Sequence, residues 1–207
     1  MIIGYNRSKY LIWGLSAKNI KESIRNVIGA PLYGLPQDEP LFTMRQMPTV
    51  VFSDFARRNR TVLKIEKGKD ADTKFYEDTY AKPQKMVVVS GQTNQQIIKE
   101  IETNANKIIS IFKSEEIKEK QRRISKSLHK TNNIESVLGI TLDFPSAYRV
   151  ATETDNFFWL RRDIKTGTLN ILVYEVPLDI ISEGDEAIND VIKMRDSIGK
   201  LYVPGPL

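Results

Sequence analysis

The fold of this chain is decided by residues 86–130, which read MVVVSGQTNQQIIKEIETNANKIISIFKSEEIKEKQRRISKSLHK. The stretch begins with an apolar run typical of a strand, turns at Gly91 and continues with a helical spacing of apolar residues. Thr93 and Gln96 form a capping-box pattern, which predicts where the helix begins. One face of this helix must pack on a sheet or another helix, because apolar residues recur on it every three or four positions: Ile97, Ile101, Ala105, Ile108 and Phe112.

The second half of the predicted helix is strongly charged. Residues 113–130 contain seven Lys or Arg and three Glu, a net charge of +4 within a chain whose net charge is +5. Such a run is most often a solvated helix face, and we expect it to be one here. The alternative is a surface that binds nucleic acid or another polyanion, for which the candidate residues are Lys118, Arg122, Arg123 and Lys126.

Composition excludes several kinds of site. The chain has no cysteine, which rules out disulfides, thiolate zinc sites and a cysteine nucleophile. Its single histidine, His129, lies in the charged segment and predicts an exposed residue at a helix end, not a metal ligand. We expect no metal, no cofactor and no catalytic residues. No run of about 18 apolar residues is present, so the sequence predicts no membrane span.

Around the central stretch, the sequence predicts an α+β fold with a mixed or antiparallel sheet, helices packed on one face and one long central helix. The periodicity predicts strands at residues 1–6, 41–47 and 61–66, a loop at residues 7–15, and a polar segment at residues 67–85 that leads into the next strand. Beyond Gly139 three strands form a meander that a final helix follows. We therefore expect an N-terminal α/β part over residues 1–139 and a meander with a helix over residues 140–207. The ending, Pro204-Gly205-Pro206, predicts a connector to a further C-terminal region.

The loop between Tyr33 and Phe42 is the candidate partner-binding segment. Two prolines restrict it, so little conformational entropy is lost when it binds. Its candidate contact residues combine aromatic anchors with polar groups: Tyr33, Pro36, Gln37, Asp38, Glu39 and Phe42. Asp38 and Glu39 also leave open a hydrolase that uses two carboxylates, although adjacent side chains usually point apart.

Four separated motifs resemble, in order and spacing, a family of uncharacterised lipoproteins from Bacteroidetes-type bacteria, a domain-of-unknown-function family. The motifs are GLPQDEPLF at residues 34–42, YAKPQ at 80–84, DNFFWL at 155–160 and KMRDS at 193–197 followed by Pro204-Gly205. The resemblance runs the length of the chain. It implies export and a lipid anchor on a cysteine behind a signal peptide, and it implies no catalytic residues. The sequence departs from the family because it has neither signal peptide nor cysteine, which is what a partial chain would show.

These observations predict a non-catalytic binding or scaffolding domain of the cell envelope. We expect its partner to be an envelope protein, or the membrane surface reached through a lipid anchor in the full-length form. The expected location is the periplasmic side of the envelope. Nucleic acid is not an expected partner, and polyanion binding and hydrolysis remain the two alternatives.

Overall fold

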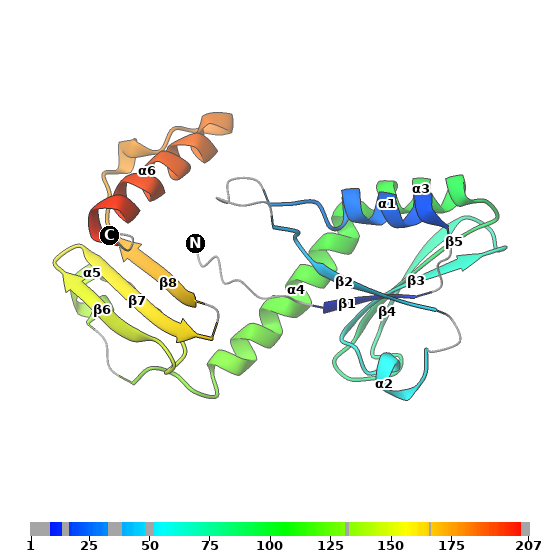
Figure 1. Cartoon of the computed structure of the whole chain (residues 1–207), viewed down its shortest axis with the longest axis horizontal. Helices are drawn as coiled ribbons and strands as arrows, with labels where there is room; N and C mark the ends of the chain where they lie inside the picture. Colours follow the sequence, from blue (N-terminus) through cyan, green and yellow to red (C-terminus); the bar gives the residue numbers. More distant parts are fainter. Residues whose placement is uncertain are drawn as a thin grey trace. The chain divides into compact units, whose positions relative to one another are not determined.

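The computed structural model describes residues 9–13, 17–32, 39–48, 52–130, 133–165 and 167–203. The chain divides into two compact units, an N-terminal unit over Gly4–Arg122 and a C-terminal unit over Arg123–Leu207. The fold is α+β, as predicted, with one sheet in each unit (Figure 1). The predicted strand at residues 1–6 lies outside the described residues.

The sheet of the N-terminal unit is mixed, with the strand order β2-β1-β3-β5-β4. Its strands are β1 (Lys9–Trp13), β2 (Thr43–Met47), β3 (Thr61–Lys67), β4 (Asp72–Glu77) and β5 (Lys85–Gly91). The first four in spatial order run parallel, and β4 is antiparallel to β5 at the edge. Two of these strands were not predicted: β1 lies where a loop was expected, and β4 lies in the segment interpreted only as polar. An edge strand such as β4 is hard to recognise in a sequence, because its alternation of apolar and polar residues is short and the surrounding segment is polar.

Three helices pack on one face of this sheet: α1 (Lys18–Val27), α3 (Asn94–Thr103) and the first half of α4 (Ala105–Ile124). The core between them includes Ile24, Leu63, Val87, Ile101 and Phe112, each at most 2% exposed. The predicted apolar stripe is therefore confirmed. A short helix, α2 (Asp54–Arg57), covers the other face through Phe52, Ala56, Val62 and Met86 (Figure 1).

The capping box is also confirmed, but the long helix is broken. Gln96 N donates to Thr93 Oγ1 (3.2 Å) and Thr93 N donates to Gln96 Oε1 (3.3 Å). The break lies at Asn104, between α3 and α4. The Asn104 side-chain amide donates to Glu100 O (2.9 Å) and to Thr73 Oγ1 (3.1 Å) on β4. Asparagine side chains compete in this way with backbone N–H groups for hydrogen-bond acceptors, which favours the end of a helix at such a residue.

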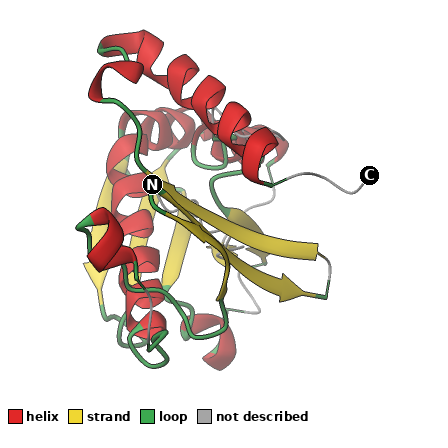
Figure 2. Ribbon diagram, turned by 90° about the vertical axis from the view of Figure 1, so that its left-hand side faces the viewer, coloured by secondary structure: helices red, strands yellow, loops and turns green. Residues whose placement is uncertain are grey.

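The C-terminal unit consists of an antiparallel meander with helices around it (Figures 1 and 2). Its elements are α5 (Ile134–Leu138), β6 (Arg149–Thr154), β7 (Phe157–Ile164), β8 (Gly167–Tyr174), η2 (Leu178–Ile180), η3 (Gly184–Glu186) and α6 (Ala187–Tyr202). The core contains Ile134, Phe144, Phe158 and Leu160. Because Ile134 of α5 packs in this core, the division between units falls at Arg122/Arg123, before the boundary expected after residue 139.

His129 belongs to the same unit and is not the exposed residue that the sequence predicts. Its ring is partly buried and stacks on Phe144, with ring centroids 4.7 Å apart. Its backbone N–H donates to Phe144 O (2.9 Å). After α4 the chain therefore packs against the core of the C-terminal unit. His129 is not an exposed residue at the end of a helix.

One prediction concerns acid stability. Hydrogen bonds from Lys64 (2.5 Å) and Lys69 (2.6 Å) hold the pKa of Glu66 on β3 below its usual value. Because the folded pKa lies below the unfolded one, the ionised group stabilises the fold above the unfolded pKa, and this contribution disappears as pH falls through the folded pKa. We expect Glu66→Gln to remove a contribution of less than about 1 kcal/mol at neutral pH and to flatten stability between pH 5 and 3, roughly the carboxyl range.

Urea unfolding at several pH values checks this expectation. Glu102→Gln, at an exposed position on α3, is the matched control and should leave the pH profile unchanged. An acid limb in Glu66→Gln as steep as that of the parent protein would contradict the assignment.

Candidate functional site

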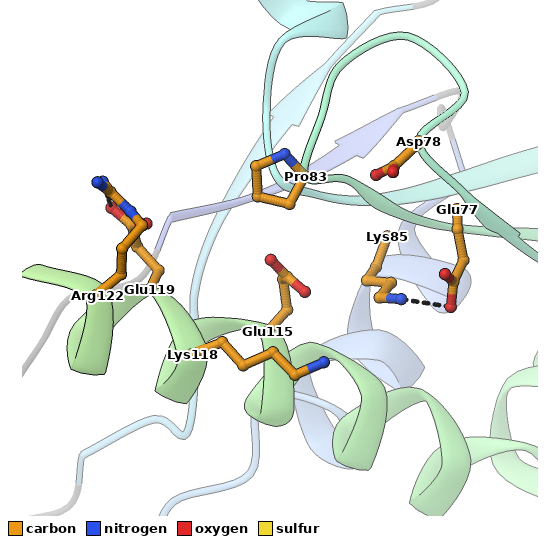
Figure 3. Close-up of a pocket in the computed structure, with 8 residues that line it drawn as sticks. All are labelled: Glu77, Asp78, Pro83, Lys85, Glu115, Lys118, Glu119 and Arg122. Carbon is orange, nitrogen blue, oxygen red and sulfur yellow. Dashed lines mark hydrogen bonds and ion pairs between the residues drawn. The ribbon is translucent and has the colours of Figure 1, made fainter.

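The candidate site is a charged hollow of about 280 Å³ within the N-terminal unit. Four of its lining residues come from β4, β5 and the loop that joins them: Glu77, Asp78, Pro83 and Lys85. The other four come from α4: Glu115, Lys118, Glu119 and Arg122. Figure 3 shows the two sets facing each other across the hollow. The lining has carboxylates and cationic groups on both sides, so its chemistry is that of ionic recognition.

The α4 residues share one face because they are spaced three and four positions apart. This face continues the apolar stripe of the helix, which passes from Ile108 and Phe112 directly to Glu115 and Glu119. The expectation that the second half of the helix is solvated is therefore wrong for its glutamates. Glu115 is 4% exposed, Glu116 8% and Glu119 7%. The helical spacing continues the core face from Phe112 to Glu115 and Glu119, so the sequence does indicate that these two glutamates share that face.

Arginines hold two of the buried glutamates. Arg60, which precedes β3, places Nη2 at 2.8 Å and 3.0 Å from the two carboxylate oxygens of Glu116 and Nη1 at 3.5 Å from Glu119 Oε1. Arg122 donates to the other side of Glu119, from Nε (2.6 Å) and Nη2 (2.8 Å). Paired, two-point bonds of this kind fix the direction of a carboxylate. One end of the hollow is therefore rigid.

The strand side of the hollow is held by Glu77, Lys85 and Gln84. Glu77 and Lys85 are register partners on β4 and β5 and form an ion pair (Figure 3). Gln84 is fully buried, and its Nε2 donates to Arg57 O (2.6 Å) and Asn59 O (2.7 Å). Its Oε1 accepts from Tyr80 N (3.0 Å). Gln84 thus fixes the 78–84 loop, and through it the position of Asp78 and Pro83.

We expect Gln84→Ala to lower the free energy of unfolding by about 2 to 3 kcal/mol, because it removes a buried side chain that bonds two backbone carbonyls and one amide. Equilibrium urea unfolding measures the loss. Gln95→Ala, at an exposed position on α3, is the matched control and should change stability by less than about 0.5 kcal/mol. Equal stability of the two variants would contradict the role of Gln84.

Glu115 differs from the other lining carboxylates. No hydrogen bond or ion pair reaches its side chain from the part of the chain that the structure describes, although the residue is only 4% exposed. Its carboxylate points from α4 towards the Pro83 side of the hollow (Figure 3). Asp78 lies across from it and accepts one hydrogen bond at Oδ1, from Gln84 N (2.9 Å). The hollow therefore presents a carboxylate acceptor with unused capacity.

The candidate partner-binding loop is only partly visible. Tyr33, Pro36, Gln37 and Asp38 lie outside the described residues. Glu39 is partly buried, and its carbonyl accepts from Leu32 N (3.1 Å). Phe42 is 4% exposed and packs in the main core, so it cannot serve as an anchor for a partner. The assignment of Phe42 as an anchor is therefore wrong. Its large apolar ring lies beside the start of a strand and is stabilised by burial in the core.

Of the four basic residues of the polyanion alternative, two lie at the hollow. Lys118 and Arg122 line the hollow, and Arg122 is bonded to Glu119. Arg123 and Lys126 belong to the C-terminal unit. Among the described residues, no group of three or more His, Cys, Asp or Glu side chains could hold a metal ion. No helix in the described ranges is long and apolar enough to cross a membrane.

Two family models of unknown function match the chain. Residues 14–125, more than half of the sequence, match the model described as a domain of unknown function, DUF8532. The chain belongs to the DUF8532 family. Residues 127–207 match a second domain of unknown function, DUF4837. The two matches meet at the end of α4, close to the structural division, so the DUF8532 match coincides with the unit that carries the hollow. No curated protein and no solved structure is significantly similar to the chain.

Proposed function

We propose that this protein is a non-catalytic binding module of the cell envelope and that the hollow beside α4 receives a charged group of its ligand or partner. The observation that carries the proposal is the side chain of Glu115, which is 4% exposed, lines the hollow and has no partner in the described part of the chain. Its carboxylate oxygens are not enclosed away from solvent, so a ligand that enters the hollow can reach them. A carboxylate in this position can accept hydrogen bonds from a group that enters the hollow, and ligand binding is the role that this geometry supports best.

The envelope location rests on the sequence motifs that resemble Bacteroidetes-type lipoproteins. We infer that the full-length gene product is exported and held at the membrane by a lipid on an N-terminal cysteine. The relation to two families of unknown function is compatible with this location and supplies no activity. A partner would then be an envelope protein or a molecule of the periplasmic space.

Polyanion binding has less support as the function. The Arg122 guanidinium is engaged by Glu119. Buried glutamates on the same helix also lower its positive potential towards a phosphate backbone. Hydrolysis by Asp38 and Glu39 has no supporting observation, since Asp38 lies outside the described residues.

Site-specific photo-crosslinking in the native host tests the proposal. A photoreactive side chain at Lys118, on the rim of the hollow, should give an adduct in the envelope fraction when it is placed in the full-length protein. The matched control is the exposed Lys99 on α3, which does not line the hollow. We expect no adduct from position 99 and loss of the position-118 adduct in Glu115→Gln.

Two outcomes would overturn the proposal. A full-length protein found in the cytosol, without lipid modification, would remove the envelope location. Equal adducts from positions 118 and 99, unaffected by Glu115→Gln, would remove the hollow as the binding site.

A further inference from the structure

We propose that the hollow binds a primary ammonium group and that Glu115 is the carboxylate that receives it. This inference rests on the proposed function, because it names the chemical group bound at the same hollow. Four carboxylates line the hollow, and three already have partners: Glu77 pairs with Lys85, Asp78 accepts from Gln84 N, and Glu119 accepts from Arg122. Glu115 is the fourth.

The side chain of Glu115 indicates that its partner is a cation. The residue is only 4% exposed and no group of the described chain donates to its carboxylate, so an opposite charge in the hollow is the partner that this group lacks. Its carboxylate faces the hollow and not the core (Figure 3). A bound cation would therefore complete an arrangement that the protein leaves incomplete.

The surrounding groups favour an organic cation over a metal ion. Calcium requires about six to eight oxygen ligands, and magnesium nearly ideal octahedral geometry. The lining instead contains Lys85, Lys118 and Arg122, whose charges repel a divalent ion, and the described chain offers no cluster of three or more metal-binding side chains. An ammonium group brings one charge and three hydrogen-bond donors, which needs far fewer protein oxygens.

The second acceptor for such a group is Asp78. Its Oδ1 is used by Gln84 N (2.9 Å), and Figure 3 shows its carboxylate turned towards the hollow, across from Glu115. A volume of about 280 Å³ lies at the small end of ligand sites, so the hollow suits one aminoalkyl group and not a large ligand. Such a group is found at the end of a lysine side chain and in a free amino acid.

The test is a titration of the ¹H–¹⁵N amide signals of the protein with defined probes. Nα-acetyl-lysine methylamide has only a side-chain ammonium, whereas alanine methylamide has only an α-ammonium. The comparison probes are Nε-acetylated lysine derivatives, which have no charge at that end, inorganic phosphate and calcium chloride. We expect the ammonium probes to shift the signals of residues 77–85 and 115–122 with a dissociation constant in the millimolar range, and the stronger probe identifies the source of the group.

Three variants make the test specific. Glu115→Gln keeps the size of the side chain and removes its charge, so it should weaken ammonium binding at least about tenfold. Glu102→Gln, an exposed glutamate on α3, should leave binding unchanged. Lys118→Ala removes a like charge from the rim and should strengthen binding about two- to fivefold, the size of one exposed charge interaction. A merely structural role of Glu115 would not produce this opposite response, and the amide spectrum itself reports whether each variant folds.

Each contrary result has a separate meaning. Shifts with phosphate and not with ammonium would overturn the inference but leave a binding site in place. Shifts by calcium at lower concentration than by either ammonium probe would assign the site to a metal ion, and would overturn the inference as well. If no probe shifts the hollow signals at tens of millimolar, the ammonium assignment fails, while photo-crosslinking at position 118 separately decides the proposed function.

Discussion

Phe158→Ala is expected to lower the free energy of unfolding of the C-terminal unit by about 3 to 5 kcal/mol, the usual cost of removing a buried phenylalanine ring. Phe158 lies on β7, is 0% exposed and packs with Ile134, Phe144 and Leu160. The neighbouring elements are held by a sheet, so they cannot collapse fully into the space that the ring leaves. The effect should approach the whole stability of a small unit.

Fluorescence can assign this loss to the correct unit, because each unit has one of the two tryptophans in the chain, Trp13 on β1 and Trp159 on β7. In a Trp13→Phe background, the urea midpoint reported by Trp159 should fall. Leu178→Ala is the control, because Leu178 is 102% exposed and its truncation should cost less than about 0.5 kcal/mol. A loss below about 1 kcal/mol in Phe158→Ala would show that this cluster is not the core of the unit.

Arg60→Ala is expected to lower the free energy of unfolding of the N-terminal unit by about 3 kcal/mol. The guanidinium faces two buried carboxylates, at 2.8 Å from Glu116 and 3.5 Å from Glu119. The side chains of these glutamates are 10% and 8% exposed, so water cannot replace the lost charge well. Breaking such a pair from one side costs more than the pair itself contributes.

The control and the rescue variant define this prediction. Arg58→Ala, at an exposed position two residues earlier, should change stability by less than about 0.5 kcal/mol. Arg60→Ala combined with Glu116→Gln should recover part of the loss, because the buried charge is removed together with its partner. If the double variant is no more stable than Arg60→Ala alone, the loss does not arise from the charge of Glu116.

Local signals in the sequence identify most elements of the fold. The Thr93 capping box, the stripe from Ile97 to Phe112 and the strands of the C-terminal meander are all where their spacing predicts them. Each depends on contacts within a few residues or on one periodic face, and such patterns are written in the sequence itself. The parts that were not predicted are β1, β4 and the break at Asn104. Their placement depends on strand partners and on Thr73, which are distant in the sequence.

The candidate site also separates what local sequence signals determine from what tertiary contacts determine. The sequence by itself determined that Glu115, Lys118, Glu119 and Arg122 share one helix face, because helical spacing requires it. Only the tertiary structure decided that the two glutamates of this face are buried and that Glu115 faces a hollow, because the opposing wall comes from residues 77–85, thirty or more positions earlier in the chain. A charged helix face is expected to be exposed to solvent unless another segment of the chain is known to cover it. Here the loop fixed by the buried Gln84 covers it, and no local pattern records that contact.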